Sequence, residues 1–309
     1  MKHKDMEQLA HHYIRAKGGA KANPRVSAVL ERLVADLFKA IDDLDLTEDE
    51  IWAGIDFLEG AGKNGELKLM VAGLGLDRFM DIRLEESEAR YGIGGGTPRT
   101  IEGPLYVHGA PVCEGFARLD DDPAEGAEVL IMEGTVRTIN GEPLPGAVVE
   151  VWHANGNGDY SYFDESQSEY NLRRTIIADD NGHYCFRSVC PAGYGVPADG
   201  SCQKMLDKLD RHGQRPPHIH FFVHAADHRK LTTQINLEGS KYTYDDYAFA
   251  DKLALTPHLR QISDEQMIKN FELDGPFKYI EFDFRLHPEV PGAPPSEVER
   301  RRARDYLAD

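Results

Sequence analysis

The chain has 309 residues, of which 53 are acidic and 35 are basic, so its net charge at pH 7 is −18. A charge of that size and sign argues against binding to nucleic acid or to an anionic membrane surface. The length is sufficient for one large domain or two smaller ones with an ample hydrophobic core.

A helical pattern is predicted from Asn23 to about Glu88. Asn23 and Pro24 are typical of an N-cap and the first helical position, and residues 47–50 (TEDE) form a capping box that begins a second helix. A third helix is predicted over residues 66–88. The first helix carries an apolar face at helical spacing, made of Val26, Leu30, Leu33, Val34, Leu37 and Ile41. No chemistry-bearing motif lies in this part, so its surplus apolar faces indicate a packing partner.

Beyond residue 96 the pattern changes to short β-rich runs separated by turns. A hairpin is predicted at Asn140-Gly141, between the apolar runs 129–132 and 148–151. The spacing of these runs predicts an antiparallel β-sandwich. The expected fold class is therefore mixed α and β, with an N-terminal helical region over residues 1–96 and a β-sandwich domain over residues 97–309.

Two glycine-rich segments resemble nucleotide-binding loops only in part. Residues 73–78 (GLGLDR) lack the third glycine and a preceding strand, and residues 92–98 (GIGGGTP) lack the P-loop lysine and a following helix start. Both are predicted to be turns, and the second is expected to link the two parts of the chain. A dinucleotide cofactor is therefore not expected.

The cysteines and the N-terminus indicate a cellular compartment. The four cysteines have no Cys-x-x-Cys spacing, so neither a zinc-thiolate nor a thioredoxin-like centre is expected. No apolar signal segment follows Met1, and no run approaches transmembrane length. We therefore expect a cytoplasmic protein with reduced cysteines.

The tripeptide His218-Ile219-His220 is the strongest candidate for part of a metal site. In a strand, side chains two residues apart point to the same face with Cα atoms roughly 6–7 Å apart, which suits two imidazoles that converge on one ion. The apolar run that follows favours a strand, and Pro216 and Pro217 define its start. His224 shares the face but lies too far along it. Taken alone, the pair is equally compatible with two unrelated histidines.

Tyrosines are the remaining candidate ligands, because there is no His-Glu-x-x-His motif and no carboxylate beside either histidine. Tyr160 and Tyr194 both lie in glycine-flanked segments, which allow the backbone to approach a ligand closely. Tyr162 has the same ring two residues after Tyr160 and is a rival to it.

Seven segments together make the chain resemble the intradiol ring-cleaving dioxygenases, in their catechol-cleaving branch, over nearly its whole length. In that family two tyrosines and two histidines hold ferric iron, which implies Tyr160, Tyr194, His218 and His220 here, with Tyr160 preferred to Tyr162 by its spacing to Tyr194. The segments are 97–106 (TPRTIEGPLY), 149–155 (VEVWHAN), 160–164 (YSYFD), 171–175 (NLRRT), 193–195 (GYG), 213–220 (GQRPPHIH) and 231–236 (LTTQIN).

The donor set suits Fe(III), a hard cation for which phenolate oxygen is a hard donor, once the bound ion lowers the phenol pKa. The resemblance implies that a catechol and O2 give cis,cis-muconate with both oxygen atoms retained, and that Tyr194 leaves the metal and acts as a base. Arg215, held rigidly by the prolines after it, is expected to stabilise negative charge on the reacting ring and oxygen. A simple ion pair with a carboxylate is the alternative. Gln234 is expected either to contact substrate or to satisfy a buried backbone group.

The resemblance also implies the walls of the substrate pocket. Tyr247 stands where phenylalanine is expected, and its hydroxyl would alter the polarity of the rim. Ala248 is small, which favours catechol itself or a methylcatechol. Core packing is the alternative for each apolar position. The implied walls are Leu69, Ala72, Ile101, Pro104, Leu105, Arg215, Tyr247 and Ala248.

The N-terminal helices are expected, by the same resemblance, to build a symmetric homodimer and to roof the pocket, with a lipid as a further implied ligand between them. Two alternatives remain for the function. One is cleavage of hydroxyquinol or chlorocatechol by the same chemistry, and the other is a non-enzymatic carrier with a transthyretin-like sandwich.

Overall fold

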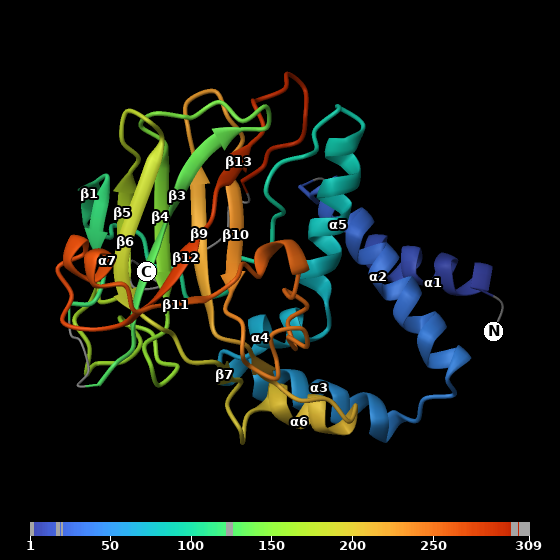
Figure 1. Ribbon diagram of the computed structural model, residues 1–309. Coiled ribbons are helices and arrows are strands. Elements are labelled where there is room, and N and C mark those ends of the chain that lie inside the picture. The colour runs from blue at the N-terminus through green and yellow to red at the C-terminus, as the bar shows by residue number, and fades with distance from the viewer. Residues whose placement is uncertain (1–2, 17–18, 20, 122–125, 298–301, 303–309) are drawn as a thin grey trace. The chain divides into compact units, whose positions relative to one another are not determined.

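The computed structural model describes residues 3–297 and 302, apart from 17–18, 20 and 122–125 (Figure 1). The chain forms two compact units, Met1–Asn64 and Gly65–Asp309. Helices occupy the first unit and begin the second, and the strands follow, so the predicted mixed α and β class is confirmed. Among the described helices, none has the length and apolar content needed to cross a bilayer.

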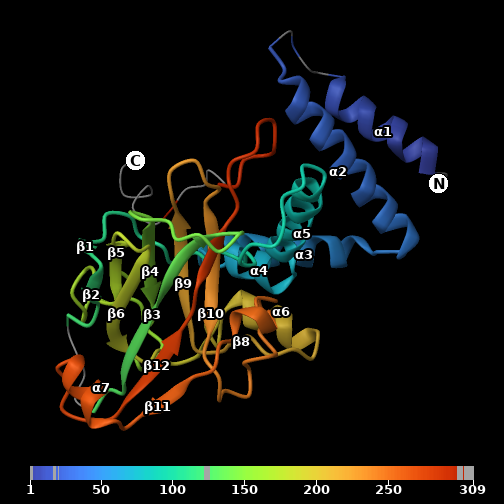
Figure 2. The same cartoon turned by 45° about the horizontal axis from the view of Figure 1, so that its top comes forward.

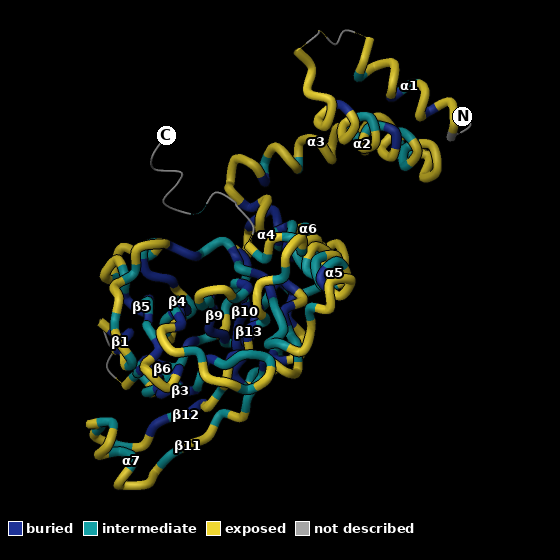
Figure 3. The backbone as a smooth tube through the Cα atoms, turned by 90° about the horizontal axis from the view of Figure 1, so that it is seen from above, coloured by how far each residue is buried: buried dark blue, intermediate teal, exposed yellow. Residues whose placement is uncertain are grey.

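The described residues of the first unit form three helices, α1 (His3–Arg15), α2 (Pro24–Asp43) and α3 (Glu48–Lys63). Both predicted N-caps are confirmed: the Asn23 side chain accepts from the N–H groups of Arg25 and Val26, and Thr47 forms the capping box with Glu50. The helix α1 was not predicted and packs along α2. Much of α2 and α3 is exposed (Figure 3), including the large apolar side chains of Val26, Val29, Leu30, Leu33, Leu37, Trp52, Ile55 and Leu58.

The second unit begins with two helices where one was predicted over residues 66–88. They are α4 (Leu67–Gly73) and α5 (Leu76–Ala89). The single-helix prediction is wrong because Gly75 adopts the left-handed conformation at φ +75°, which ends one helix and starts the next. The predicted turn at this glycine-rich segment is confirmed. Three short helices follow later in the unit: α6 (Ser201–Lys208), the 3₁₀ helix η1 (Leu253–Leu255) and α7 (Glu265–Asn270).

Two large sheets form the body of this unit (Figure 2). The first has the order β1 (Val112–Glu114), β5 (Arg173–Ile177), β4 (Val148–His153), β9 (His218–His224) and β10 (Leu231–Asn236). The second has the order β11 (Arg260–Ile262), β12 (Phe277–Glu281), β3 (Val129–Thr138), β6 (His183–Val189) and β2 (Phe116–Arg118), with β13 (Phe284–Leu286) paired to the far end of β3.

The predicted hairpin at Asn140-Gly141 is wrong, although the turn itself exists with Gly141 at φ +93°. The strands on its two sides, β3 and β4, belong to different sheets, so the chain crosses from one sheet to the other after the turn. The sheets are also not purely antiparallel, because β1–β5, β2–β6, β12–β3 and β13–β3 are parallel pairs.

The strand β9 places its alternate side chains in two different environments. Ile219, Phe221 and Val223 join a core cluster to which both large sheets contribute. Phe222, from the opposite face, belongs to a second cluster that includes Trp152 and Tyr160. Because the side chains alternate, His218 and His220 lie on the same face as Phe222 and point away from the main core.

Candidate active site

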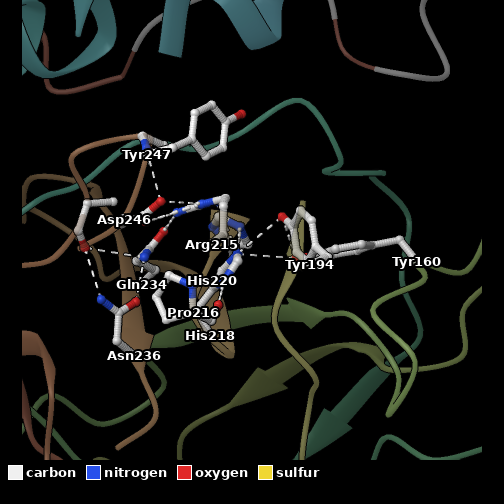
Figure 4. Close-up of polar contacts among 12 residues, drawn as sticks. Tyr160, Tyr194, Arg215, Pro216, His218, His220, Gln234, Asn236, Asp246 and Tyr247 are labelled. Atoms are coloured by element: carbon white, nitrogen blue, oxygen red, sulfur yellow. Dashed lines mark hydrogen bonds and ion pairs between the residues drawn. The ribbon is translucent and has the colours of Figure 1, made fainter. Parts of the chain in front are cut away.

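His218 and His220 converge as predicted on one face of β9. Their Nε2 atoms are 3.2 Å apart, and both residues are only 1% exposed (Figure 4). His220 is further fixed by neighbours on both sides. The Trp152 indole stacks on its ring at 5.1 Å with 6° between the planes, and Gly103 approaches so closely that a Cβ there would lie 3.4 Å from the ring.

The His218 ring has a defined tautomer. Its Nδ1 donates a hydrogen bond to the Pro216 carbonyl at 2.7 Å, so the neutral ring presents a lone pair at Nε2. Burial, helped by the nearby Arg215 charge, lowers the pKa of His218 to about 3. The ring is therefore neutral at physiological pH, which is the form that binds metals.

Tyr160 and Tyr194 bring their hydroxyl groups to the same point. The two oxygens are 3.5 Å apart, and they lie 3.5 Å and 3.3 Å, respectively, from His218 Nε2. A glycine permits this approach: Gly158 has φ +94°, and a Cβ on it would lie 3.0 Å from the Tyr194 Cβ. The sequence prediction that glycine-flanked segments bring these tyrosines inward agrees with this geometry.

Tyr162 lies outside this cluster. Its backbone is left-handed, with φ +73°, and its ring packs edge-on against Phe163. Its buried hydroxyl has no hydrogen-bond partner among the described residues. His224, at the end of β9, is half-buried and pairs in register with Val148, away from the donor cluster.

The four donor atoms fit a hard, highly charged metal ion. Burial, followed by the proximity of Tyr194, raises the pKa of Tyr160 well above its ordinary value, so the phenol would ionise only beside a strong positive charge. Within the described ranges no group of three or more His, Cys, Asp or Glu side chains is placed to hold a metal ion. The tyrosines are therefore needed to complete a donor set around the two imidazoles.

Arg215 borders the donor cluster from the short strand β8 (Gln214–Arg215), which pairs with β7 (Tyr194–Gly195) outside the two large sheets. Its Nη1 donates to His218 Nε2 at 3.1 Å. Burial is the largest single influence on Arg215 and disfavours its charge, but Asp246, together with Tyr194 and Tyr247, outweighs burial and holds the pKa of Arg215 above its ordinary value. The guanidinium is therefore a permanent charge beside the cluster, and the ion pair that the sequence left as an alternative is also present.

The Gln234 amide takes part in the same buried network. It lies opposite His220 in the β9–β10 ladder, and its Oε1 accepts from Arg215 Nη2 at 2.7 Å. Its Nε2 donates to Asn236 Oδ1 at 2.6 Å and to the Ala250 carbonyl at 3.3 Å. The amide is thus hydrogen-bonded within the protein and steadies Arg215.

A cavity of about 230 Å³ opens beside Tyr194 and Arg215. Every residue that the sequence predicted as a wall of the substrate pocket lines it. Further lining residues were not predicted as walls; they are Lys68, Asp77, Gly103, Gly195, Val196 and Pro197. The predicted wall residues in its lining are Leu69, Ala72, Ile101, Pro104, Leu105, Arg215, Tyr247 and Ala248.

Two buried charged residues at the site were not singled out from the sequence. Asp246 forms the ion pair with Arg215, and its side chain is fully buried. Arg173 donates through Nε to the Ser161 hydroxyl, through Nη2 to the Ser161 carbonyl and through Nη1 to the Leu105 carbonyl, each at 2.9 Å. Its guanidinium also lies 5.8 Å from the centre of the Tyr160 ring. No spacing rule connects either residue to its partners, although Arg173 falls within a segment that carries the family resemblance.

Two family models match most of the chain. Residues 101–288 match the family described as "Dioxygenase", and residues 23–92 match the one described as "Catechol dioxygenase N terminus". Together they cover the strands, the donor residues and most of the N-terminal helices.

Individual relatives agree with these matches. A catechol 1,2-dioxygenase of Acinetobacter baylyi is 48% identical over 91% of each chain, and catechol 1,2-dioxygenase 2 of Acinetobacter lwoffii is 55% identical over 78% of this chain and 87% of its own. The crystal structure of the wild-type Acinetobacter radioresistens catechol 1,2-dioxygenase superposes with a TM-score of 0.95 at 49% identity, covering 98% of both chains. Two other relatives are less similar. A chlorocatechol 1,2-dioxygenase of Pseudomonas putida is 34% identical over 72% of this chain and 82% of its own. A hydroxyquinol 1,2-dioxygenase of Nocardioides simplex is 33% identical over 87% of this chain and 91% of its own.

Proposed function

The chain belongs to the catechol dioxygenase family, and from this premise we propose that it is an intradiol dioxygenase acting on catechol. It cleaves the ring between the two hydroxyl-bearing carbons with O2 and gives cis,cis-muconate, which retains both oxygen atoms. The single observation that carries the proposal is the convergence of Tyr160, Tyr194, His218 and His220 beside the cavity that contains Arg215.

The resident metal in this proposal is Fe(III), held by the four converging side chains. The two phenolates would offset two of its three positive charges, and the two imidazoles are neutral, so the ion would remain a Lewis acid. When bound, the ion supplies a site for both oxygens of the diol and withdraws electron density that prepares the ring for reaction with O2. No external reductant is then required.

Tyr194 is the proposed proton acceptor, and Tyr160 the permanent phenolate ligand. Tyr194 borders the cavity, whereas Tyr160 is 3% exposed and is enclosed by the cluster around Trp152 and Phe222. The Tyr194 oxygen is therefore placed to take a proton from an entering diol. Tyr160 lacks that access and is suited to stay in place.

Arg215 is the proposed electrostatic stabiliser of the reaction. Asp246 and Gln234 hold the guanidinium in position. It therefore needs no rearrangement when negative charge develops on the ring and on the incoming oxygen. Such preorganised donors act in a buried site where water does not screen them.

The cavity walls favour a single small ring. Apolar side chains from α4 and from the segment after residue 100 line the cavity together with Tyr247 and Ala248, and an apolar lining of this kind suits an aromatic ring. Small Ala248 supports catechol or a methylcatechol as substrate. The lower identity to hydroxyquinol and chlorocatechol enzymes supports the same preference.

Several broader proposals accompany this function. We divide the chain into an N-terminal helical region (1–96) and a catalytic β-sandwich (97–309), a division supported by the separate family models and by the core cluster shared between the sheets, whereas the compact units separate at residue 64 and place α4 and α5 with the strands. The exposed apolar side chains of α2 and α3 support a homodimer interface, with a lipid as a further ligand there. The cytoplasm is the proposed location.

The decisive experiment is an anaerobic titration of the iron-loaded protein with catechol, followed by admission of O2. A visible phenolate-to-iron band that shifts on binding, and then decays as muconate absorbance rises in the ultraviolet, is expected. A protein that stays colourless and inactive after iron loading would reject the proposal and favour the carrier alternative.

A further inference from the structure

The Arg215 guanidinium is fixed along one edge by a buried carboxylate. Its Nε lies 3.2 Å from both oxygens of Asp246, and its Nη2 lies 2.9 Å from Oδ2. Nη2 also donates to Gln234 Oε1 at 2.7 Å. Only Nη1 is directed toward the donor cluster, where it reaches His218 Nε2 at 3.1 Å (Figure 4). The Asp246 contact therefore decides which edge of the guanidinium faces the reaction.

The same carboxylate also shapes a cavity wall. Asp246 Oδ1 accepts the backbone N–H of Ala248 at 3.0 Å, and the Asp246 carbonyl accepts the N–H of Phe249 at 2.9 Å. Phe249 has φ +57°, so the chain makes a tight turn here, and this turn presents Tyr247 and Ala248 to the cavity. One side chain thus fixes both a cation and a wall of the pocket.

The pair is buried enough for this contact to matter. The Asp246 side chain is fully buried, and that of Arg215 is 4% exposed. Buried charges lose their hydration, so each must be held by close partners in good geometry. A guanidinium with two of its nitrogens bound in this way has little rotational freedom left, in contrast with a lysine ammonium.

We propose that Asp246 is a positioning residue for ring cleavage, which holds the Arg215 guanidinium with Nη1 toward the reacting atoms and ties it to the Tyr247–Ala248 wall. This inference rests on the proposed function. The hydrogen bonds of the Asp246 carboxylate go to Arg215 and to the Ala248 N–H, and none among the described residues goes to the four donor side chains, so it acts through Arg215. Because small misplacements of a catalytic group cost large factors in rate, its loss is expected to lower kcat much more than it raises KM.

Two substitutions test the proposal. Asp246→Asn keeps the shape but places an amide N–H₂ against the guanidinium, and we expect kcat to fall about 100-fold with KM within about threefold of wild type. Asp246→Glu keeps the charge but moves it by one methylene, and a drop of about 10-fold is expected. Asp245→Asn is the matched control, because Asp245 lies on the same turn, is largely exposed and pairs with His212 instead. It should leave kcat and KM unchanged.

Readouts other than turnover separate positioning from folding. The Asn variant should retain its iron content, and it should bind catechol anaerobically with an affinity within about threefold of wild type. In an Arg215→Lys background, which cannot form the two-nitrogen contact, adding Asp246→Asn should lower kcat by less than about threefold more. Full additivity of the two losses would show that Asp246 does not act through Arg215 and would overturn the inference.

The outcomes distinguish this inference from the proposed function. If iron-loaded wild-type protein does not cleave catechol, the proposed function fails. If wild type is active and Asp246→Asn has wild-type kcat, the inference fails alone. Should Asp246→Asn not fold, Asp246→Glu decides: a kcat within twofold of wild type overturns the inference, and a selective loss of kcat supports it.

Discussion

Tyr194 and Arg215 lie directly opposite each other in the short β7–β8 ladder. This pairing is separate from both large sheets, and it connects the proposed proton acceptor to the proposed electrostatic stabiliser through backbone hydrogen bonds. The two side chains therefore keep a fixed relation to each other beside the cavity. The ladder depends on a close backbone approach at Gly193, where an added Cβ would lie 2.6 Å from the Arg215 carbonyl oxygen.

Gly193→Ala should separate the two strands of this ladder. The new methyl group would meet backbone atoms of Arg215 and Pro217, which cannot move as a flexible side chain does. We expect the free energy of unfolding to fall by about 1–3 kcal/mol, as in other overpacked sites, and kcat to fall at least ~10-fold because Tyr194 and Arg215 shift. Urea unfolding and steady-state kinetics measure the two effects.

Gly156→Ala is the control for this substitution. Gly156 lies in the loop before Tyr160, an added Cβ there would meet no heavy atom within 4 Å, and its backbone is not left-handed. The alanine should be tolerated with unchanged kinetics. Equal losses of stability and kcat in both variants would show that the losses do not come from the close contact between β7 and β8.

Tyr160→Phe and Tyr162→Phe distinguish the two rival tyrosines. Tyr160 Oη lies 3.5 Å from both Tyr194 Oη and His218 Nε2, whereas the Tyr162 ring packs on Phe163. We expect Tyr160→Phe to lose or strongly shift the visible phenolate band and to lower kcat at least ~100-fold, because even outer-shell changes at metal sites cost 10- to 100-fold. Visible spectra and iron analysis after loading report the result.

Tyr162→Phe is its matched partner, since it removes the same atom two residues away. The Tyr162 hydroxyl is buried without a hydrogen-bond partner among the described residues, so its removal should leave the band and the kinetics intact. The opposite pattern, with the band lost only in Tyr162→Phe, would exchange the roles of the two tyrosines.

Local patterns marked candidate donors, and the family resemblance selected the proposed set of four from them. His218 and His220 obey the two-residue repeat of a strand, and a strand is what the apolar residues around them form. The glycine beside Tyr194 marks a close backbone approach that the structure contains. The choice of Tyr160 over Tyr162 came from the family resemblance, because both are tyrosines in the same short segment and no local pattern separates them.

The remaining features depend on contacts between distant parts of the chain. Asp246 meets Arg215 across 31 residues, and no local pattern marks that pairing. The Asn140-Gly141 turn gave a correct local signal, but which strand pairs with β3 depends on how both sheets bury their faces. A turn was predicted at residues 73–78, yet one helix was predicted across it over residues 66–88, because glycine within a helical pattern is often tolerated; the chain instead ends α4 there and begins α5.

Arg173→Met should destabilise the loop that carries Tyr160. The substitution leaves the buried Ser161 carbonyl and the partly buried Leu105 carbonyl without their donor. Each unsatisfied buried group costs about 1–3 kcal/mol, so we expect the free energy of unfolding to fall by about 3 kcal/mol. Urea unfolding measures this loss, and Arg32→Met, at an exposed ion pair with Asp36, should show no measurable change. Equal stability of the Arg173 variant and wild type would contradict the role given to these bonds.

Asp81 on α5 is expected to make stability depend on pH. Burial raises the pKa of Asp81 from 3.8 to about 6, although the charges of Lys252, Arg99 and Arg78 oppose that shift and Glu85 adds to it. When a carboxyl has a higher pKa in the folded protein than in the unfolded chain, its ionisation lowers the free energy of unfolding. Its stabilising contribution is greatest below pH 3.8 and declines as the pH rises through 6.

Asp81→Asn should therefore stabilise the protein increasingly between about pH 5 and pH 7.5. The difference in unfolding free energy between variant and wild type should grow by about 1 kcal/mol over that interval and then level off, because Asp81 is fully ionised in both states above it. Urea unfolding of both proteins across the pH range measures the difference. The other titratable groups are common to both proteins, so their contributions cancel in it. A difference that stays constant from about pH 5 to pH 8 would show that the Asp81 carboxyl ionises in the folded protein as it does in the unfolded chain.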